Sequence, residues 1–281
     1  MNQSTTLKNI DNFNPFAGPK IERVIHTTPS QSEIWIACKL GGNDANRAYN
    51  ESVSLILKGD LNSDALEYAL QKLVQRHESL RAVFSTDGSY MSILETMLIE
   101  LSYQDVSQLT ASEKEEAITE YLSKDAHHIF DLVKGPLLKV GILKTDKYEH
   151  QLVITAHHII CDGWSLGIML QELGSLYSAK AQNETVVLPQ PESFVTFSDE
   201  QQEFLKSDEY KKTERFWLKQ YASSIPQLNL PTDFPRPQLR TYKSARLDFS
   251  VDSNLLTALK KTGIKAGSSF VSTLMVAFEM F

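Results

Sequence analysis

The sequence predicts an α/β or α+β domain in which a mixed sheet is flanked by helices, and three observations support this fold class. Segments with alternating apolar residues, typical of strands, are interleaved with segments whose apolar residues recur at helical spacing. One strand-like segment, 152–156, leads almost directly into a helix-like segment. Glycine and proline residues separate many of these segments, as expected for loops between elements.

The first half of the chain contains elements that can be assigned in order. Ser30-Gln31-Ser32-Glu33 matches a helix capping box, and we expect a short helix there that ends at Gly41-Gly42. The next expected elements are a strand through Val53, Leu55 and Leu57, a helix from Ser63 with Leu66, Leu70, Leu73 and Val74 on one face, a strand with Leu80, Ala82 and Phe84 on one side and Arg81 and Val83 on the other, a strand near 91–98 and a helix near 111–122.

The second half continues the same alternation. The expected elements are strands at 137–143 and 152–156, a helix with Leu166, Leu170, Leu173 and Tyr177 on one face, helical segments near 197–204 and 209–221, a strand with Leu247, Phe249 and Val251, a helix capped near Ser253 with Leu255, Leu256 and Leu259, and a last helix from Ser268-Ser269. The segment 230–237 contains three prolines, which disfavour helix and central strand, so we expect an extended crossing.

These elements suggest four parts of the chain. We expect a leader or linker at 1–22, an N-terminal lobe at 23–188, helices and the proline-rich connector at 189–240, and the start of an incomplete second lobe at 241–281. A strand and two helices after the connector are too few for an independent core, and the last helix lacks a C-cap signal. We therefore expect the second lobe to be truncated in this sequence.

Composition excludes several classes of protein. The chain has 281 residues, 42% of them hydrophobic, and a formal net charge of −7 with no basic stripe, which argues against nucleic acid binding. It contains neither an apolar run of membrane-spanning length nor the charged and apolar regions of a secretion signal. Cys38 and Cys161 lie far apart and imply no disulfide framework, so we expect a cytoplasmic protein.

The most informative stretch of the sequence is His157-His158-Ile159-Ile160-Cys161-Asp162-Gly163, which lies between an apolar strand and an amphipathic helix. Successive strand side chains point to opposite faces, so the two histidines are expected to have different roles. A histidine at such a corner can take a proton from an attacking group. Asp162 is expected to be a structural carboxylate bonded to a buried arginine or to turn amides, and Ser165 is a candidate helix N-cap. Gly163 permits a backbone angle or a close approach of a ligand that a side chain would block.

The histidine pair has other interpretations. Adjacent histidines alone are weakly specific, and the pair His127-His128, which no glycine or amphipathic helix follows, is interpreted as surface or core filler. A metal site at the motif is disfavoured, because adjacent strand side chains diverge and no typical ligand pattern accompanies them. Cys161 has apolar neighbours and no dedicated base, so we expect a buried packing residue rather than a nucleophile.

The motif and four other stretches resemble condensation domains of nonribosomal peptide synthetases, in the chloramphenicol-acetyltransferase-like superfamily. The segment 157–165 resembles the HHxxxDG signature of that family. In the same order as in the family, similar stretches occur at Thr28–Gln31 with Glu33–Trp35, at Arg76–Phe84, at Phe130–Leu138 and at Leu230–Pro237. The resemblance extends from about Ile21 to Phe281.

The resemblance implies formation of an amide bond between a carrier-bound acyl or peptidyl thioester donor and a carrier-bound aminoacyl acceptor. It implies that His158 is the catalytic base or the residue that positions the amine, and leaves these two roles open. His157 and Asp162 would support the corner, Asp162 would pair with Arg81, and Gly163 would line the substrate channel. No cofactor would bind directly, since donor and acceptor carrier domains supply substrates on phosphopantetheine. Neighbouring synthetase domains are the other expected partners.

The family's reaction channel lies between two lobes, so the resemblance also implies that this chain alone is inactive. An epimerization domain, which shares the HHxxxDG signature, and a non-catalytic module that docks carrier proteins remain alternatives. A heterocyclization domain is disfavoured because its aspartate pattern is absent, and a hydrolase because no nucleophile elbow is evident.

Overall fold

A computed structural model provides the structure of the chain. It describes residues 18–227, 229, 231–238, 241–242, 244, 247 and 249–280. The chain divides into two compact units, Met1–Tyr242 and Lys243–Phe281, which are considered separately. Most of the leader expected at 1–22 lies outside the described residues, and its last two positions belong to the first strand. The remaining part boundaries expected from the sequence stay predictions.

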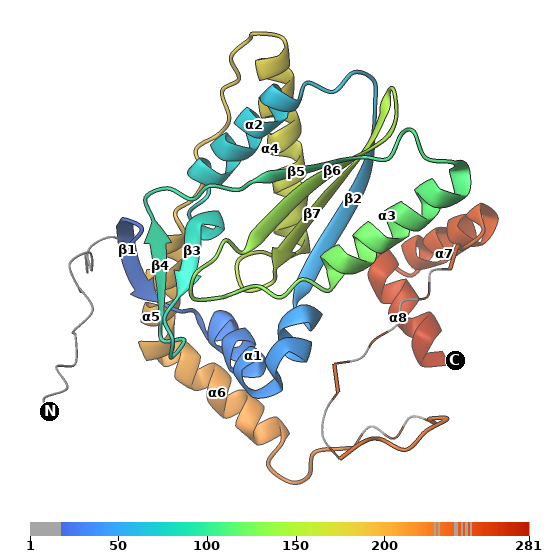
Figure 1. The fold of residues 1–281 in the computed structure, drawn as a ribbon. Helices are drawn as coiled ribbons and strands as arrows, with labels where there is room; N and C mark the ends of the chain where they lie inside the picture. The colour runs from blue at the N-terminus through green and yellow to red at the C-terminus, as the bar shows by residue number, and fades with distance from the viewer. Residues whose placement is uncertain are drawn as a thin grey trace, which may run out of the picture. The chain divides into compact units, whose positions relative to one another are not determined.

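The first unit is organised around a four-stranded mixed sheet (Figure 1). Its strand order is β2-β7-β6-β5, with β2 (Asn50–Lys58), β7 (Glu149–His157), β6 (Leu138–Asp146) and β5 (Leu101–Asp105). Strands β2, β7 and β6 are antiparallel neighbours, and β5 is parallel to β6. The expected mixed sheet is therefore confirmed, and β7, which leads to the motif, lies inside it.

Helices cover both faces of this sheet, as the sequence predicts (Figure 1). On one face, α2 (Ser63–Arg76) and α4 (Gly163–Ala181) contact each other and bury their apolar stripes against β7. Leu152, Ile154 and Ala156 of β7 belong to this core. On the other face, α3 (Ala111–Ala126) contacts β2 and β7. There, Thr155 bonds to the buried Asp125, which also forms a 2.5 Å ion pair with Lys139. Burial on both faces makes β7 a rigid support for the residues that follow it.

A second, three-stranded antiparallel sheet has the order β1-β4-β3, with β1 (Ile21–His26), β4 (Tyr90–Leu94) and β3 (Ala82–Phe84). The strand expected through Leu80 and Arg81 is shorter than predicted. These two residues belong to the 3-10 helix η1 (Glu78–Arg81), whose first turn closes with a bond from the Leu80 N–H to the His77 carbonyl. The chain turns directly after α2 and reaches its ladder partner only at Ala82.

The helix α1 (Pro29–Ala48) differs from its prediction at both ends. Its N-cap is Thr28, whose side chain accepts from the Gln31 N–H at 3.3 Å while the Gln31 side chain accepts from the Thr28 N–H at 3.0 Å. The capping box predicted at Ser30–Glu33 is therefore displaced by two residues, because Pro29 suits the first helical position. At Gly42 the backbone adopts a φ of 60°, which kinks the helix without ending it.

The remaining elements largely follow the sequence pattern. In the first unit, α5 (Phe194–Lys206) and α6 (Asp208–Gln220) confirm the two expected helical segments, and residues 231–238 form neither helix nor strand. The second unit contains α7 (Ser253–Lys265) and α8 (Phe270–Met280). The strand expected through Leu247, Phe249 and Val251 is wrong: these residues are exposed, and no ladder pairs them with another strand in the described ranges. An alternating pattern becomes a strand only when it finds a partner.

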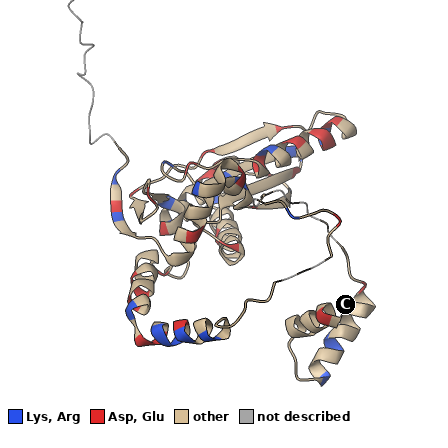
Figure 2. Cartoon of the chain, turned by 90° about the horizontal axis from the view of Figure 1, so that it is seen from below, with Lys and Arg blue, Asp and Glu red and all other residues tan. Residues whose placement is uncertain are grey.

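Charged residues are interspersed over the surface. Figure 2 shows blue and red segments mixed along the described part of the chain, with a dense mixture on α6. None of the helices in the described ranges is long and apolar enough to cross a membrane.

Candidate functional site

The motif forms a corner between the end of β7 and the start of α4, which we call the histidine corner (His157–Ser165). Residues 158–160 form a turn, which closes with a hydrogen bond from the Ile160 N–H to the His157 carbonyl at 3.0 Å. Asp162 then begins the helix as its N-cap. The corner is thus fixed on one side by a central strand and on the other by a capped helix.

His157 is completely buried. Its Nδ1 accepts a hydrogen bond from the Ile159 N–H at 3.2 Å, and its Nε2 lies 3.8 Å from the Cys38 Sγ. The Phe130 ring packs edge-on against the imidazole at a centroid distance of 6.0 Å. Burial, and secondarily the neighbouring charge of His158, lowers the pKa of His157 to about 4. His157 is therefore neutral near pH 7 and shapes the turn.

His158 has the opposite environment. Its side chain is 45% exposed, and its backbone N–H donates to the Tyr49 carbonyl at 2.8 Å, which fixes the residue beside the start of β2. Its Nε2 lies 3.4 Å from Oε2 of Glu51, the second residue of β2. The divergence of the two histidines expected from strand parity is confirmed, and His158 is the one accessible to a substrate.

Asp162 closes the turn. Its Oδ1 accepts from the Ser165 N–H at 2.8 Å and from the Ser165 hydroxyl at 2.7 Å. The Ser165 hydroxyl, the Ser165 amide and the charge of His158 lower the pKa of Asp162. The turn-amide role is confirmed, whereas the predicted pairing of Asp162 with Arg81 is wrong. Ser165 is not the N-cap but the residue that donates to it.

Gly163 is the first residue of α4, and its missing side chain leaves room for Glu51. A Cβ atom at this position would lie 3.2 Å from Oε1 of Glu51, a tight contact that requires the carboxylate to shift. The space beside Gly163 is therefore occupied in part by a side chain of the neighbouring strand, and approach of a ligand to Gly163 stays a prediction.

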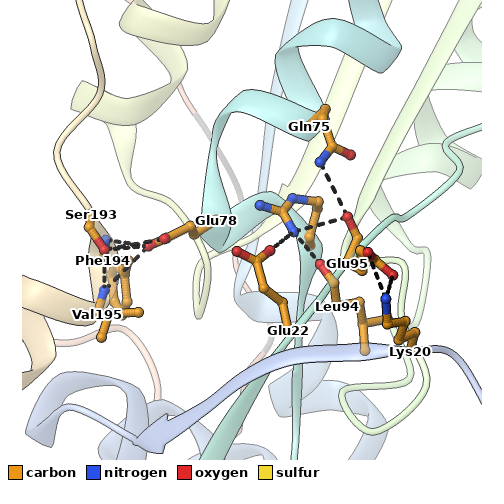
Figure 3. A network of polar contacts seen from close by, with 10 residues as sticks. Lys20, Glu22, Gln75, Glu78, Leu94, Glu95, Ser193, Phe194 and Val195 are labelled. Atoms are coloured by element: carbon orange, nitrogen blue, oxygen red, sulfur yellow. Dashed lines mark hydrogen bonds and ion pairs between the residues drawn. The ribbon is translucent and has the colours of Figure 1, made fainter.

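Arg81 lies in the other sheet region and is 4% exposed. Its Nη1 forms an ion pair with Glu22 at 2.9 Å and donates to the carbonyls of Leu94 and Glu95 (Figure 3). These partners belong to β1 and to the end of β4, so Arg81 fastens the three-stranded sheet rather than the histidine corner. The sequence could not reveal this, because Arg81 lies in a 3-10 turn and not in the strand that parity assumed.

The residues before Arg81 make similar connections, and we call Arg76–Arg81 the anchor segment. Arg76 Nε and His77 Nε2 lie 2.9 and 2.7 Å from the same Glu172 oxygen on α4. Glu78 accepts from the Phe194 N–H at 2.7 Å, and from the Ser193 hydroxyl and the Val195 N–H, at the start of α5 (Figure 3). A carboxylate at a helix N-terminus is favourable. The segment therefore ties α2 to α4, α5, β1 and β4.

A small cavity of about 110 Å³ separates the anchor segment from the histidine corner. Its lining residues are His77, Ser79, Leu80, Ile160, Cys161, Ser165, Ile168 and Met169. Neither His158 nor Arg81 lines it. Both motifs therefore line the same small cavity, but the His158 and Arg81 side chains do not meet there.

The remaining titratable groups of the motif are packing residues. Burial raises the pKa of the Cys161 thiol to about 12 and that of the Cys38 thiol to about 11, so neither is a nucleophile near neutral pH. The prediction of a buried packing role for Cys161 is confirmed. In the described ranges, no group of three or more His, Cys, Asp or Glu side chains is arranged to hold a metal ion.

The second histidine pair behaves as expected for filler. His127 is exposed at the end of α3, with its Nδ1 2.7 Å from the Ser123 carbonyl. His128 packs edge-on against Phe130, at a centroid distance of 4.6 Å. Two doublets with the same composition thus differ in whether the fold presents an imidazole beside a carboxylate.

Comparison with known proteins gives a consistent result. A family model described as "Condensation domain" matches residues 21–281. The chain is 32% identical to malpinin synthetase from Mortierella alpina, over 89% of this chain and 3% of that protein, and 32% identical to bacitracin synthase 2 from Bacillus licheniformis, over 89% of this chain and 9% of that protein. Its fold is similar to the crystal structure of the starter condensation domain of the rhizomide synthetase RzmA, with a TM-score of 0.64, 22% identity, and coverage of 72% of this chain and 48% of that chain.

Proposed function

Because the chain belongs to the condensation domain family of nonribosomal peptide synthetases, we propose that it takes part in forming an amide bond between two carrier-bound substrates. The donor is an acyl or peptidyl thioester, and the acceptor is an aminoacyl group. The observation that carries this proposal for the present chain is the half-exposed imidazole of His158, held beside Glu51 at the end of a buried strand.

The proposed reaction begins with attack of the neutral acceptor amine on the thioester carbonyl. The new C–N bond forms as the carbonyl becomes tetrahedral, and the nitrogen then carries a proton that must leave. His158 receives this proton, or it positions the amine so that the proton can leave as the amide forms. Collapse of the intermediate breaks the C–S bond, and the carrier thiolate regains a proton. His157, neutral and buried, and Asp162 keep the imidazole in place.

Gly163 is proposed to line the channel that delivers the substrates. It lies at the start of α4, beside Glu51 and five residues after His158. A residue without a side chain leaves space both for the Glu51 carboxylate and for a substrate that approaches the imidazole.

The proposed partners are donor and acceptor carrier domains, which present the substrates on phosphopantetheine, and neighbouring synthetase domains. The chain spans 3% and 9% of the length of the two curated relatives named above and about half of the RzmA domain chain. We place the reaction in the cytoplasm. Because the family's channel lies between two lobes, residues 1–281 alone are expected to give little or no product.

The test uses the protein that carries this chain, with acyl-loaded donor and aminoacyl-loaded acceptor carrier domains. Wild type should form the amide, and His158→Ala should lower kcat by about 100-fold or more, because general base catalysis typically contributes that much. Binding of the carrier domains should be nearly unchanged. His127→Ala, in the other histidine pair, is the matched control and should behave as wild type.

Three results would contradict parts of the proposal. An amide formation rate near that of wild type in His158→Ala would remove the proposed role of this residue. Binding of carrier domains without any amide formation by wild type would favour the docking module. Rapid turnover by residues 1–281 alone would refute the expected requirement for a second lobe.

A further inference from the structure

Glu51 is a charged residue that no sequence motif includes, yet the fold places it at the histidine corner. In the β2–β7 ladder, Glu51 is opposite Ala156, and Asn50 is opposite His157. Directly opposite residues in a sheet project to the same face, so the Glu51 side chain lies on the face that carries Ala156 and packs toward α4. The bond from the His158 N–H to the Tyr49 carbonyl extends the pairing by one residue and brings the imidazole alongside.

The Glu51 carboxylate is held close to the imidazole without being used elsewhere. Its Oε2 is inaccessible to solvent and accepts no hydrogen bond, and it lies 3.4 Å from His158 Nε2. A buried carboxylate oxygen that accepts no hydrogen bond raises the free energy of the folded protein. A hydrogen-bond donor beside it therefore stabilises the fold. The His158 ring N–H is such a donor, and in the described ranges His158 is the only residue that forms an ion pair with Glu51.

The other acidic group at the corner, Asp162, makes its hydrogen bonds within the helix cap. Asp162 faces His158 from the start of α4, but its Oδ1 accepts two hydrogen bonds from Ser165. From β7, the buried His157 presents a neutral ring whose Nδ1 is bonded to the Ile159 N–H. Of the acidic groups that face His158 from β2 and α4, Glu51 is the one that forms an ion pair with the imidazole in the described ranges.

We propose that Glu51 is a positioning residue for His158, which orients its imidazole and stabilises the imidazolium formed when the ring takes the acceptor proton. A carboxylate oxygen 3.4 Å from the imidazole nitrogen can orient the ring, and a base oriented by a third group is a recurrent catalytic arrangement. This role rests on the proposed function of His158. The pairing itself, however, is a property of the free protein and can be measured without any substrate.

Gly163 belongs to the same arrangement. A methyl group at this position would lie 3.2 Å from Glu51 Oε1 and would displace the carboxylate that faces His158. Gly163→Ala is therefore expected to weaken the Glu51–His158 pair without changing either partner. It offers a second, independent way to disturb the pair.

The first test is nuclear magnetic resonance relaxation of isotope-labelled histidine rings in residues 1–281. The His158 signals are assigned by their loss in His158→Ala. In Glu51→Gln, the His158 ring should be more mobile than in wild type, because its Nε2 loses the carboxylate that lies 3.4 Å away, and Gly163→Ala should cause a smaller change in the same direction. Glu78→Gln, a matched loss of a carboxylate in the anchor segment, should leave the His158 signals unchanged.

The second test is the rate of amide formation in the protein that carries this chain. Glu51→Gln should lower kcat about 10-fold while KM changes less than about twofold, because the imidazole remains but loses orientation and charge support. Unchanged mobility of the His158 ring in Glu51→Gln would overturn the proposal, whatever the rate. Increased mobility with unchanged kcat would overturn the positioning role. Absence of amide formation in wild type would instead refute the proposed function, and the magnetic resonance result would still decide the pairing.

Discussion

The histidine corner and the anchor segment are both rich in titratable residues, but their side chains are used differently. In the anchor segment, Arg76, His77, Glu78 and Arg81 each make close polar contacts with another element. In the histidine corner, the His158 imidazole is half exposed, and its nearest charged group is a carboxylate oxygen that makes no hydrogen bond. The two regions therefore differ in exposure: the anchor segment joins buried elements, whereas the His158 imidazole is open to solvent and lies beside a carboxylate.

This difference shows what a motif match can and cannot establish. Both stretches resemble motifs of the same family, and both contain histidine and at least one charged residue. Burial and bonding separate them: Arg81 is 4% exposed and bonded to three partners, whereas His158 is open to solvent on one side. We therefore assign architecture to the anchor segment and chemistry to the corner.

The largest effect on stability is expected from Arg81→Met. The change removes an ion pair with Glu22 and the hydrogen bonds from Arg81 to the Leu94 and Glu95 carbonyls, of which the Glu95 carbonyl keeps the Gln75 side chain as a donor. Loss of such a network should lower the free energy of unfolding by about 3 kcal/mol. Urea denaturation of residues 1–281 measures this. The control is Arg23→Met, which changes an exposed arginine on β1 and should have little effect.

A comparable effect should appear in the pH dependence of stability, through His157. Its folded pKa of about 4 is below the ordinary value of 6.5, so folding favours the neutral ring. The unfolded state binds the proton more readily, and the contribution is complete above pH 6.5 and is lost as pH falls toward 4. Its full size is about 3 kcal/mol.

The measurement is urea unfolding at several pH values in wild type, His157→Asn and His127→Asn. Acidification should destabilise His157→Asn less steeply than wild type, while His127→Asn, which lacks an exposed histidine, should follow wild type. Identical slopes in all three proteins would show that His157 is not kept neutral by burial.

A smaller effect is expected from Glu78→Ala. The carboxylate accepts from the amides of Phe194 and Val195 and from the Ser193 hydroxyl, and caps α5. Its loss should cost about 1–2 kcal/mol, as for other helix caps. Hydrogen exchange should show the α5 amides opening more readily, while β7 amides stay protected. Equal loss of protection in β7 would mean that the anchor segment does not act through α5.

Periodicity predicted most of the first unit because the apolar faces are local features of the sequence. The four residues of one face of α2, Leu66, Leu70, Leu73 and Val74, are all buried as expected. The strand β5 was missed because its short alternating pattern is largely exposed at a sheet edge. The predicted strand near Phe249 failed because pairing depends on a partner that no local pattern specifies.

The candidate site was predicted only in part. Strand parity separated His157 from His158 without saying which of them is exposed, and the exposed imidazole is the one that the family resemblance favoured. The Arg81–Asp162 pair was wrong, since each of these side chains finds closer partners in its own region. Glu51 was missed because only the β2–β7 register, a long-range feature, brings it to the corner. A charged residue near the start of a strand that pairs with the motif strand is the signal to look for.

The division of roles between the two motifs is tested most directly by the rate of amide formation per folded molecule in Arg81→Met. The rate should be measured in the protein that carries this chain, at a temperature where the variant is folded, beside His158→Ala. We predict that Arg81→Met keeps a kcat within about threefold of wild type, whereas His158→Ala loses about 100-fold or more. A folded Arg81→Met protein that is as inactive as His158→Ala would contradict the account, because Arg81 would then act in the reaction and not only in the fold.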